Sequence, residues 1–156
     1  MVHLLAAAAR QSHTLTTGLY VHIPFCIRRC GYCSFATTAS ADAGLQDRYL
    51  RMLSWEIKRQ ACEFAPAKLT SIYFGGGTPS ILKASRLADL AELINKVFSI
   101  AQDAEWTLEA HPATLSDAAG SERAHAWRSM GFNRISMGAE SLVDTTLLKI
   151  QRGYDS

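Results

Sequence analysis

The sequence predicts an α/β fold with a parallel sheet, arranged as a partial TIM-type barrel of about four βα units. A short β-type run is followed by a helix-type run four times, which is the order expected of parallel strands joined by crossover helices. Apolar residues make up 48% of the chain and charged residues 19%, which is typical of a globular domain with a core. A closed eight-unit barrel needs about 250 residues, so these 156 residues suffice for only part of one.

The first βα unit begins at Gly18–Ile23, a run that Pro24 ends. A helix is expected at about Asp42–Phe64, because apolar residues recur there every four positions. This stripe, which should face the sheet, consists of Leu45, Tyr49, Leu53, Ile57 and Ala61. The second unit begins at Leu69–Phe74 and continues through three glycines into a helix with Ser85 as its expected N-cap. The apolar face of that helix is formed by Leu87, Leu90, Ala91, Ile94, Val97 and Phe98.

The third unit is expected to begin with a strand at Glu105–Ala110, which Pro112 ends. Its helix should cover about Ser116–Met130, because Gly131 follows in a position that favours helix termination. These bounds place a carboxylate, Glu109, at the carboxyl end of the strand.

The fourth unit is expected to have a strand at Asn133–Met137. Asp144 should cap the helix that follows, and Gly153 stands in the position that ends it. The apolar residues of this short helix are Leu147, Leu148 and Ile150. With this helix the four predicted units are complete.

The N-terminal residues 1–17 are expected to be a disordered leader that precedes the folded part at 18–156. They contain no acidic residue and one arginine, so an organelle transit peptide is a weaker alternative, and the charged start of a secretory signal is missing. No apolar stretch approaches the roughly 20 residues that span a bilayer, so no membrane span is expected. The 16 basic and 14 acidic residues nearly balance, and the longest basic run is Arg28–Arg29, so no nucleic-acid partner is expected.

Three of the four cysteines, Cys26, Cys30 and Cys33, lie within eight residues directly after the first strand. Thiolates this close in sequence can converge on one centre, and such spacing is typical of iron-sulfur clusters. Three ligands for four irons leave one iron open, as in catalytic rather than closed metal sites. The alternatives are a zinc site completed by His22, a redox disulfide between Cys30 and Cys33, or unrelated buried thiols. Cys62, in the first helical stripe, is assigned no chemistry.

Two further features follow predicted strands at the end where barrels of this kind place their active sites. Gly75–Gly77 and Thr78 follow the second strand, and residues without Cβ let a ligand approach the backbone closely. Glu109 closes the third strand and should point toward the same side. The alternatives are a simple turn for the glycines and an ordinary surface acid for Glu109.

These motifs resemble the radical SAM family. Cys-x3-Cys-x2-Cys after a first strand is typical of that family, and the segment from Leu19 to Cys26 resembles the start of the oxygen-independent coproporphyrinogen III oxidase group. The resemblance extends from about Gly18 to Tyr154, and it identifies the chain as the N-terminal part of a radical SAM domain. It also implies that the chain ends before the last barrel strands and the C-terminal domain, so that activity of this part alone is not expected.

The resemblance implies a [4Fe-4S] cluster held by Cys26, Cys30 and Cys33, and S-adenosylmethionine (SAM) as the second cofactor. The glycine segment with Gly76, Gly77 and Thr78 would then receive the amino group of SAM. The other residues that the resemblance assigns to cofactor binding are Glu109, Glu140, Arg152, Tyr20 and Tyr32.

The assigned roles differ among these residues. Arg152 would bind the SAM carboxylate, because a guanidinium forms bidentate pairs with carboxylates. Glu140 stands where the family has Gln, and either residue accepts a hydrogen bond from a ribose hydroxyl. Tyr20 and Tyr32 would lie near the sulfonium and the adenine, with core packing as the alternative. His111 replaces the usual Asn or Asp and is assigned no role.

Within the group, Ser34-Phe35 stands where the oxidases carry a further cysteine, and this favours the haem chaperone subgroup. The resemblance then implies a protein that binds haem and SAM, accepts electrons from a flavodoxin-type or ferredoxin-type protein, and delivers haem to an acceptor protein. Reductive SAM cleavage is the expected enzymatic chemistry, in the cytoplasm or, as the alternative, in the mitochondrial matrix. Oxidation of coproporphyrinogen is the second hypothesis. A zinc-binding or non-catalytic interaction domain is an alternative of another class.

Overall fold

A five-stranded sheet forms the centre of the protein in the computed structural model, which describes residues 2–7, 16–40, 42–64 and 68–152. The strand order is β1-β2-β5-β6-β7. β1 is antiparallel to β2, and the other neighbours are parallel. The strands span Val2–Ala7 (β1), Thr16–Ile23 (β2), Lys68–Gly76 (β5), Ser99–Ala110 (β6) and Arg134–Met137 (β7).

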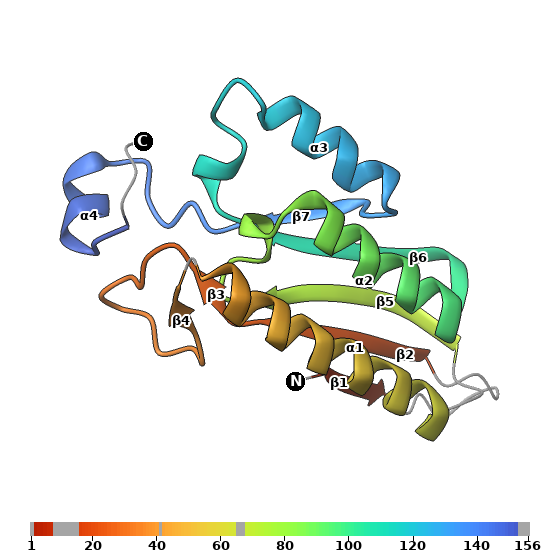
Figure 1. Ribbon diagram of the computed structural model, residues 1–156. Helices are drawn as coiled ribbons and strands as arrows, with labels where there is room; N and C mark the ends of the chain where they lie inside the picture. Colours follow the sequence, from red (N-terminus) through yellow and green to blue (C-terminus); the bar gives the residue numbers. More distant parts are fainter. Residues whose placement is uncertain (1, 8–15, 41, 65–67, 153–156) are drawn as a thin grey trace.

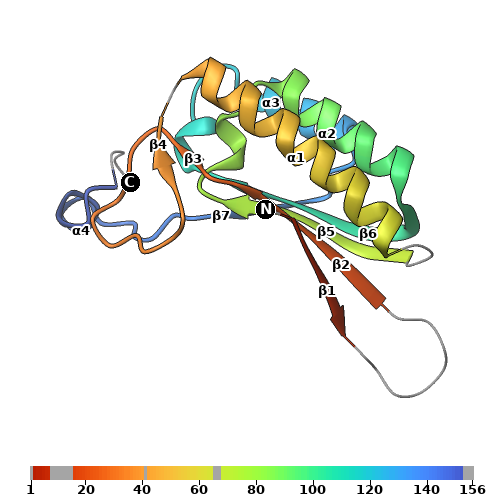
Figure 2. The same cartoon turned by 60° about the horizontal axis from the view of Figure 1, so that its bottom comes forward.

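Three helices cover one face of this sheet, as Figures 1 and 2 show. They are α1 (Ala43–Glu63), α2 (Ala84–Val97) and α3 (Gly120–Ser129). A fourth helix, α4 (Asp144–Lys149), lies beyond the carboxyl ends of the strands. Between β2 and α1 the chain forms a small parallel pair of strands, β3 (Phe25–Cys26) and β4 (Thr38–Ala39). A 3-10 turn follows β5, namely η1 (Pro79–Ile81), and another follows β6, namely η2 (Pro112–Thr114).

The core lies between the sheet and the three helices, and the alternation of strand side chains determines which residues enter it. In β2, Leu19, Val21 and Ile23 are buried against the helices, whereas Tyr20 and His22 face the other side of the sheet. The same face that carries Tyr20 and His22 is polar in the neighbouring strands and remains uncovered by helices (Figure 2). The sheet therefore has one apolar face for the core and one polar face.

The predicted α/β architecture with four βα units is confirmed, and the first predicted helix agrees closely with α1. Asp42 caps this helix, because its Oδ1 accepts hydrogen bonds from the backbone N–H groups of Gly44 at 2.8 Å and Leu45 at 3.2 Å. Leu53 and Ile57, from the predicted stripe, are 2% and 0% exposed. The stripe faces the sheet as expected.

Three predicted helix starts are wrong, and the first two are those of α2 and α3. Ser85 does not cap α2: the cap position is Lys83, without a side-chain hydrogen bond, and Ser85 lies within the first turn. α3 begins at Gly120 rather than near Ser116, because η2 and a turn occupy the residues before it. A Cβ at Gly120 would lie 2.0 Å from the backbone oxygen of Leu115, so the turn packs directly on this glycine.

The last helix also begins differently from the prediction. Asp144 is the first residue of α4 and Val143 takes the cap position, so Asp144 is not the N-cap. Its negative charge in the first turn still suits the helix dipole. The predicted stop at Gly153 lies outside the described residues.

Three strands, β2, β5 and β6, extend beyond the predicted bounds, and β1 and the short strands β3 and β4 were not predicted. β5 reaches Gly76, and β6 begins at Ser99, six residues before the predicted start, with an irregular register between Leu69 and Ser71 of β5. β1 pairs with the first six residues of β2, from Ala7 opposite Thr16 to Val2 opposite Val21. Among the described helices, none combines the length and the apolar character that crossing a bilayer requires.

Candidate functional site

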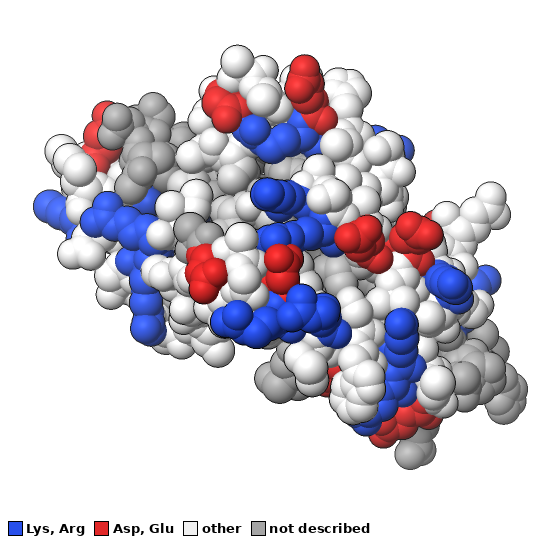
Figure 3. All heavy atoms as spheres, viewed as in Figure 1, with Lys and Arg blue, Asp and Glu red and all other residues white. Residues whose placement is uncertain are grey.

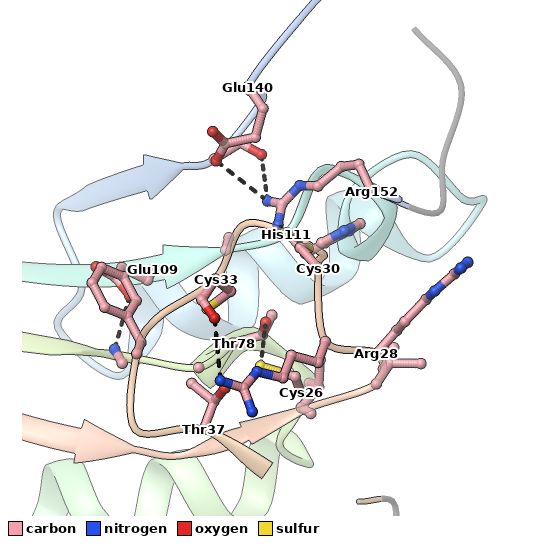
Figure 4. Close-up of a pocket in the computed structure, with 18 of the residues that line it drawn as sticks. Cys26, Arg28, Cys30, Cys33, Thr37, Thr78, Glu109, His111, Glu140 and Arg152 are labelled. Atoms are coloured by element: carbon pink, nitrogen blue, oxygen red, sulfur yellow. Dashed lines mark hydrogen bonds and ion pairs between the residues drawn. The ribbon is translucent and has the colours of Figure 1, made fainter. Parts of the chain in front are cut away.

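The carboxyl ends of the parallel strands and the loop between β3 and β4 surround one cavity of about 420 Å³ (Figure 4). All three cysteines of the predicted cluster motif line it. Seven of the eight predicted cofactor-binding residues line the same cavity, namely Tyr32, Gly76, Gly77, Thr78, Glu109, Glu140 and Arg152. The structure therefore brings together residues that are more than 120 positions apart in the sequence.

The three cysteines differ in how the fold holds them. Cys26 lies in β3 and is 9% exposed, whereas Cys30 and Cys33 lie on the loop and are partly exposed. Thr78 Oγ1 donates to Cys26 Sγ at 3.7 Å, and Arg152 Nη1 donates to Cys30 Sγ at 3.3 Å. One sulfur is thus fixed by the sheet, and the other two have freedom to adjust to a ligand.

The donor set suits an iron-sulfur cluster. The cysteines are free thiols, and thiolates are the usual ligands of such clusters. Burial raises the pKa of Cys26, and hydrogen bonds from Thr78 and Thr37 act in the opposite direction. A bound cluster would supply the driving force for deprotonation of this thiol. In the part of the chain that the structure describes, no group of three His, Cys, Asp or Glu side chains is already arranged to hold a metal ion.

His22 has a structural position. Its Nε2 lies 3.0 Å from the backbone oxygen of Ala36, at the end of the cysteine loop, and its Nδ1 lies 3.2 Å from Tyr20 Oη. Both ring nitrogens are therefore engaged, Nε2 with the loop and Nδ1 with Tyr20 of the same strand. A zinc site completed by His22 would have to break these contacts.

The glycine segment at the end of β5 is packed against the backbone at the end of β2 and in β3. Gly77 N donates to Ile23 O and Thr78 N donates to Phe25 O, both at 2.8 Å. A Cβ at Gly77 would lie 2.6 Å from Phe25 O, so no larger residue fits there. Gly76 has a φ of +115°, a conformation that side chains disfavour. These glycines fix the cavity floor at a short distance from Cys26.

Glu109 is held at the junction of β5 and β6. Its Oε1 accepts a hydrogen bond from Tyr73 Oη at 2.6 Å, and its Oε2 accepts one from Gly76 N at 2.9 Å. The sequence analysis did not identify Tyr73. The signal that could have found it is strand alternation, since Tyr73 pairs with Thr107 and so shares the face on which Glu109 lies.

Arg152 connects the far side of the cavity to the cysteine loop. Besides Cys30 Sγ, it contacts Gly138 O through Nη2 at 2.6 Å and Glu140 Oε1 at 3.9 Å (Figure 4). Glu140 has a φ of +63°, and a Cβ at Gly138 would lie 2.8 Å from Arg152 Nη2. Burial raises the pKa of the neighbouring Tyr32 to about 12, with further contributions from Cys30 and Glu140. This side of the cavity therefore combines a guanidinium, a carboxylate and a phenol.

Two residues differ from their predicted positions or roles. Tyr20 does not line the cavity: its hydroxyl contacts His22, and its ring stacks on Tyr73 with centroids 5.9 Å apart. His111, which was assigned no role, does line the cavity. Its Nδ1 accepts a hydrogen bond from Ala113 N at 3.2 Å, and burial together with Arg152 lowers its pKa.

The outer surface of the cysteine loop is basic and apolar. Ile27 is 77% exposed and Phe35 is 65% exposed. Basic side chains gather over this loop and α4, at the left of Figure 3. Arg28 extends away from the three cysteines in Figure 4, and Arg29 donates to Cys33 O at 3.2 Å. A macromolecule that approaches the cysteines from solvent would meet this surface first.

Known proteins resemble this chain over most of its length. The Radical SAM superfamily matches residues 20–156. "Heme chaperone HemW" of Haemophilus influenzae is 38% identical over 142 residues, which are 88% of this chain and 36% of the relative. "Heme chaperone HemW" of Mycobacterium tuberculosis (strain CDC 1551 / Oshkosh) is 36% identical over 137 residues, which are 86% of this chain and 34% of the relative. "Radical S-adenosyl methionine domain-containing protein 1, mitochondrial" of Danio rerio is 35% identical over 143 residues, 90% of this chain and 31% of the relative.

The solved structure of coproporphyrinogen III oxidase (HemN) from Escherichia coli, described as a radical SAM enzyme, matches 87% of this chain and 30% of its own with a TM-score of 0.77 and 31% identity. This match confirms the predicted partial barrel. The chain spans about a third of the length of these relatives. The predicted resemblance to the haem chaperone and coproporphyrinogen oxidase group is likewise confirmed, and the chain belongs to the radical SAM superfamily.

Proposed function

We propose that this chain is the cluster-binding and SAM-binding part of a haem chaperone of the radical SAM type. One observation carries the proposal: Cys26, Cys30 and Cys33 line the same cavity as Gly76, Glu109 and Arg152. A trio of thiols beside a carboxylate and a guanidinium suits a cluster with one open iron and an amino-acid ligand, because the amino and carboxylate groups of SAM then have charged partners.

Each residue has a separate task in this arrangement. The three thiolates hold the [4Fe-4S] cluster, with Cys26 as the fixed ligand in β3. Glu109 accepts hydrogen bonds from the ammonium group of SAM, and Arg152 binds its carboxylate. Gly76 and Gly77 leave room for this group to approach the backbone. When bound, the reduced cluster supplies the electron for reductive cleavage of SAM.

Other predicted residues complete the SAM site at its rim. Glu140 accepts a hydrogen bond from the ribose, Tyr32 contacts the adenine, and Thr78 supports both the glycine segment and Cys26. The reductant is a flavodoxin-type or ferredoxin-type protein. The basic and apolar surface of the cysteine loop supports this choice, because such a surface attracts an acidic partner to the cluster.

The haem-related part of the proposal concerns the whole protein to which this chain corresponds. Curated relatives are named heme chaperones, and Ser34-Phe35 follows the third cysteine where oxidases carry another cysteine. The whole protein binds haem and delivers it to an acceptor protein in the cytoplasm, with the mitochondrial matrix as the alternative, since one relative is named mitochondrial. The structural match to coproporphyrinogen III oxidase favours porphyrinogen oxidation as the second candidate.

The proposal is tested by reconstituting the protein with iron and sulfide without oxygen. About four iron and four sulfide per chain are expected, together with SAM cleavage to 5'-deoxyadenosine under reductant if the chain alone is active. Cys26→Ala, Cys30→Ala and Cys33→Ala should each lose the cluster. Cys62→Ala is the matched control, because Cys62 is exposed on α1 and does not line the cavity.

Different outcomes separate the alternatives. Stoichiometric zinc without iron or sulfide would replace the proposal with a zinc-binding domain. A cluster that survives the loss of Cys30 would contradict the assigned ligands. With the whole protein, haem binding without turnover of coproporphyrinogen supports the chaperone, and turnover without haem affinity supports the oxidase.

A further inference from the structure

Both carboxylate oxygens of Glu109 are held by groups from the neighbouring strand. Tyr73 Oη donates to Oε1 at 2.6 Å and Gly76 N donates to Oε2 at 2.9 Å. Glu109 belongs to β6 and both donors belong to β5, so rotation of the carboxylate would break at least one cross-strand hydrogen bond. Each oxygen accepts more than one hydrogen bond, so the pair can still receive a ligand donor.

We propose that Tyr73 is a positioning residue that orients Glu109 to receive the ammonium group of bound SAM. This inference rests on the proposed function, because it requires that SAM binds in the cavity. Tyr73 does not line the cavity itself, so its effect on a ligand passes through Glu109.

The environment of Tyr73 keeps it in the form that donates. Burial raises its pKa, and the hydrogen bond to Glu109 raises it further, so the phenol is protonated at neutral pH. Its ring stacks on Tyr20 at an interplanar angle of 24°. The side chain is thus fixed at its ring as well as at its hydroxyl, and it loses little additional entropy when a ligand binds.

The neighbouring Gly75 makes room for this pair. A Cβ at Gly75 would lie 2.7 Å from Cε1 of Tyr73 and 3.0 Å from the carboxyl carbon of Glu109. The first distance is shorter than real Cβ contacts allow and the second is tighter than most of them, and the crowded atoms belong to the two residues that form the hydrogen bond. The absence of a side chain at Gly75 therefore permits the Tyr73–Glu109 contact.

The test compares Tyr73→Phe with the unaltered protein, each carrying its oxidised cluster. Two ligands are used: SAM, and 5'-methylthioadenosine, which lacks the amino-acid group. Loss of a hydrogen bond to a charged group should raise the Kd for SAM about tenfold. The Kd for 5'-methylthioadenosine should not change, because this ligand offers no ammonium group to Glu109. General damage to the site would weaken both ligands.

Tyr49→Phe is the matched control. Its hydroxyl also donates a hydrogen bond, to His22 O at 2.7 Å, but Tyr49 does not line the cavity and has no contact with Glu109 among the described hydrogen bonds. It should leave both Kd values unchanged. Gly75→Ala is the second perturbation, since its Cβ would separate Tyr73 from Glu109, and it should weaken SAM selectively.

A double-mutant cycle identifies the route of the effect. In a Glu109→Ala background, Tyr73→Phe should cause no further loss of SAM affinity, because the carboxylate through which Tyr73 is proposed to act is absent. An unchanged SAM Kd in Tyr73→Phe, equal losses for both ligands, or additive losses in the double variant would each overturn the inference. Failure of the unaltered, cluster-loaded protein to bind SAM would instead contradict the proposed function.

Discussion

Gly76 offers a sharp test of how the glycine segment shapes the site. Gly76→Ala adds a Cβ at a residue with a φ of +115°. The same Cβ would lie 2.5 Å from Cε1 and from Nδ1 of His22. Because the His22 ring bridges Tyr20 and Ala36, the added atom would displace the link between β2 and the cysteine loop.

The expected cost follows from these contacts. The positive φ costs about 1–3 kcal/mol for a residue with a side chain, and loss of the His22–Ala36 hydrogen bond adds about 1 kcal/mol. The reduced entropy of the unfolded chain offsets about 0.4–1 kcal/mol of this. The free energy of unfolding should therefore fall by about 1–4 kcal/mol.

The assay is urea unfolding at 25 °C, with Gly31→Ala as the matched control. A Cβ at Gly31 would meet only the side chain of Gln151, at an ordinary contact distance of 3.5 Å. This control should change the free energy of unfolding by less than about 0.5 kcal/mol. Equal stabilities of the two variants would refute the reasoning that backbone conformation and His22 together require glycine at position 76.

Two further predictions concern α1. Replacing Asp42 with Ala removes the acceptor for the N–H groups of Gly44 and Leu45, and urea unfolding should show a loss of about 1 kcal/mol. Burial raises the pKa of Tyr49 from 10.0 to about 12, so the folded protein keeps a proton that the unfolded chain releases. The free energy of unfolding should then fall as pH rises from 10 to 12, and less steeply in Tyr49→Phe; parallel pH profiles of the two proteins would contradict this.

Much of the architecture was predictable because local patterns determine it. The four-residue apolar period predicted α1, and the stripe residues Leu53 and Ile57 are fully buried. The cysteine spacing and the residues after the strands predicted a common site, because the carboxyl ends of parallel strands meet at one edge of a sheet. Seven predicted cofactor-binding residues accordingly line one cavity with the cysteines.

The remaining features depend on contacts between distant segments. The start of α3 is determined by the packing of Gly120 on Leu115, and no local signal shows that contact. The contact between Tyr73 and Glu109 depends on the pairing of β5 with β6, because the two residues are 36 positions apart in the sequence. Tyr20 was expected at the ligand, but the register of β2 places its hydroxyl on His22 instead. Sequence motifs identify the types of residue at a site, whereas the pairing of strands determines which of these residues come into contact.

The short strand β7 has a consequence for handling the protein. It forms one edge of the described sheet, and only β6 pairs with it there. Its Ile135 and Met137 side chains are 38% and 44% exposed, so the edge combines unpaired backbone groups with apolar surface. Such an edge can pair with a compatible strand, including that of a second copy of the chain. The backbone groups of β7 that suit the next strand of a barrel are thus the same groups at which a second copy could pair.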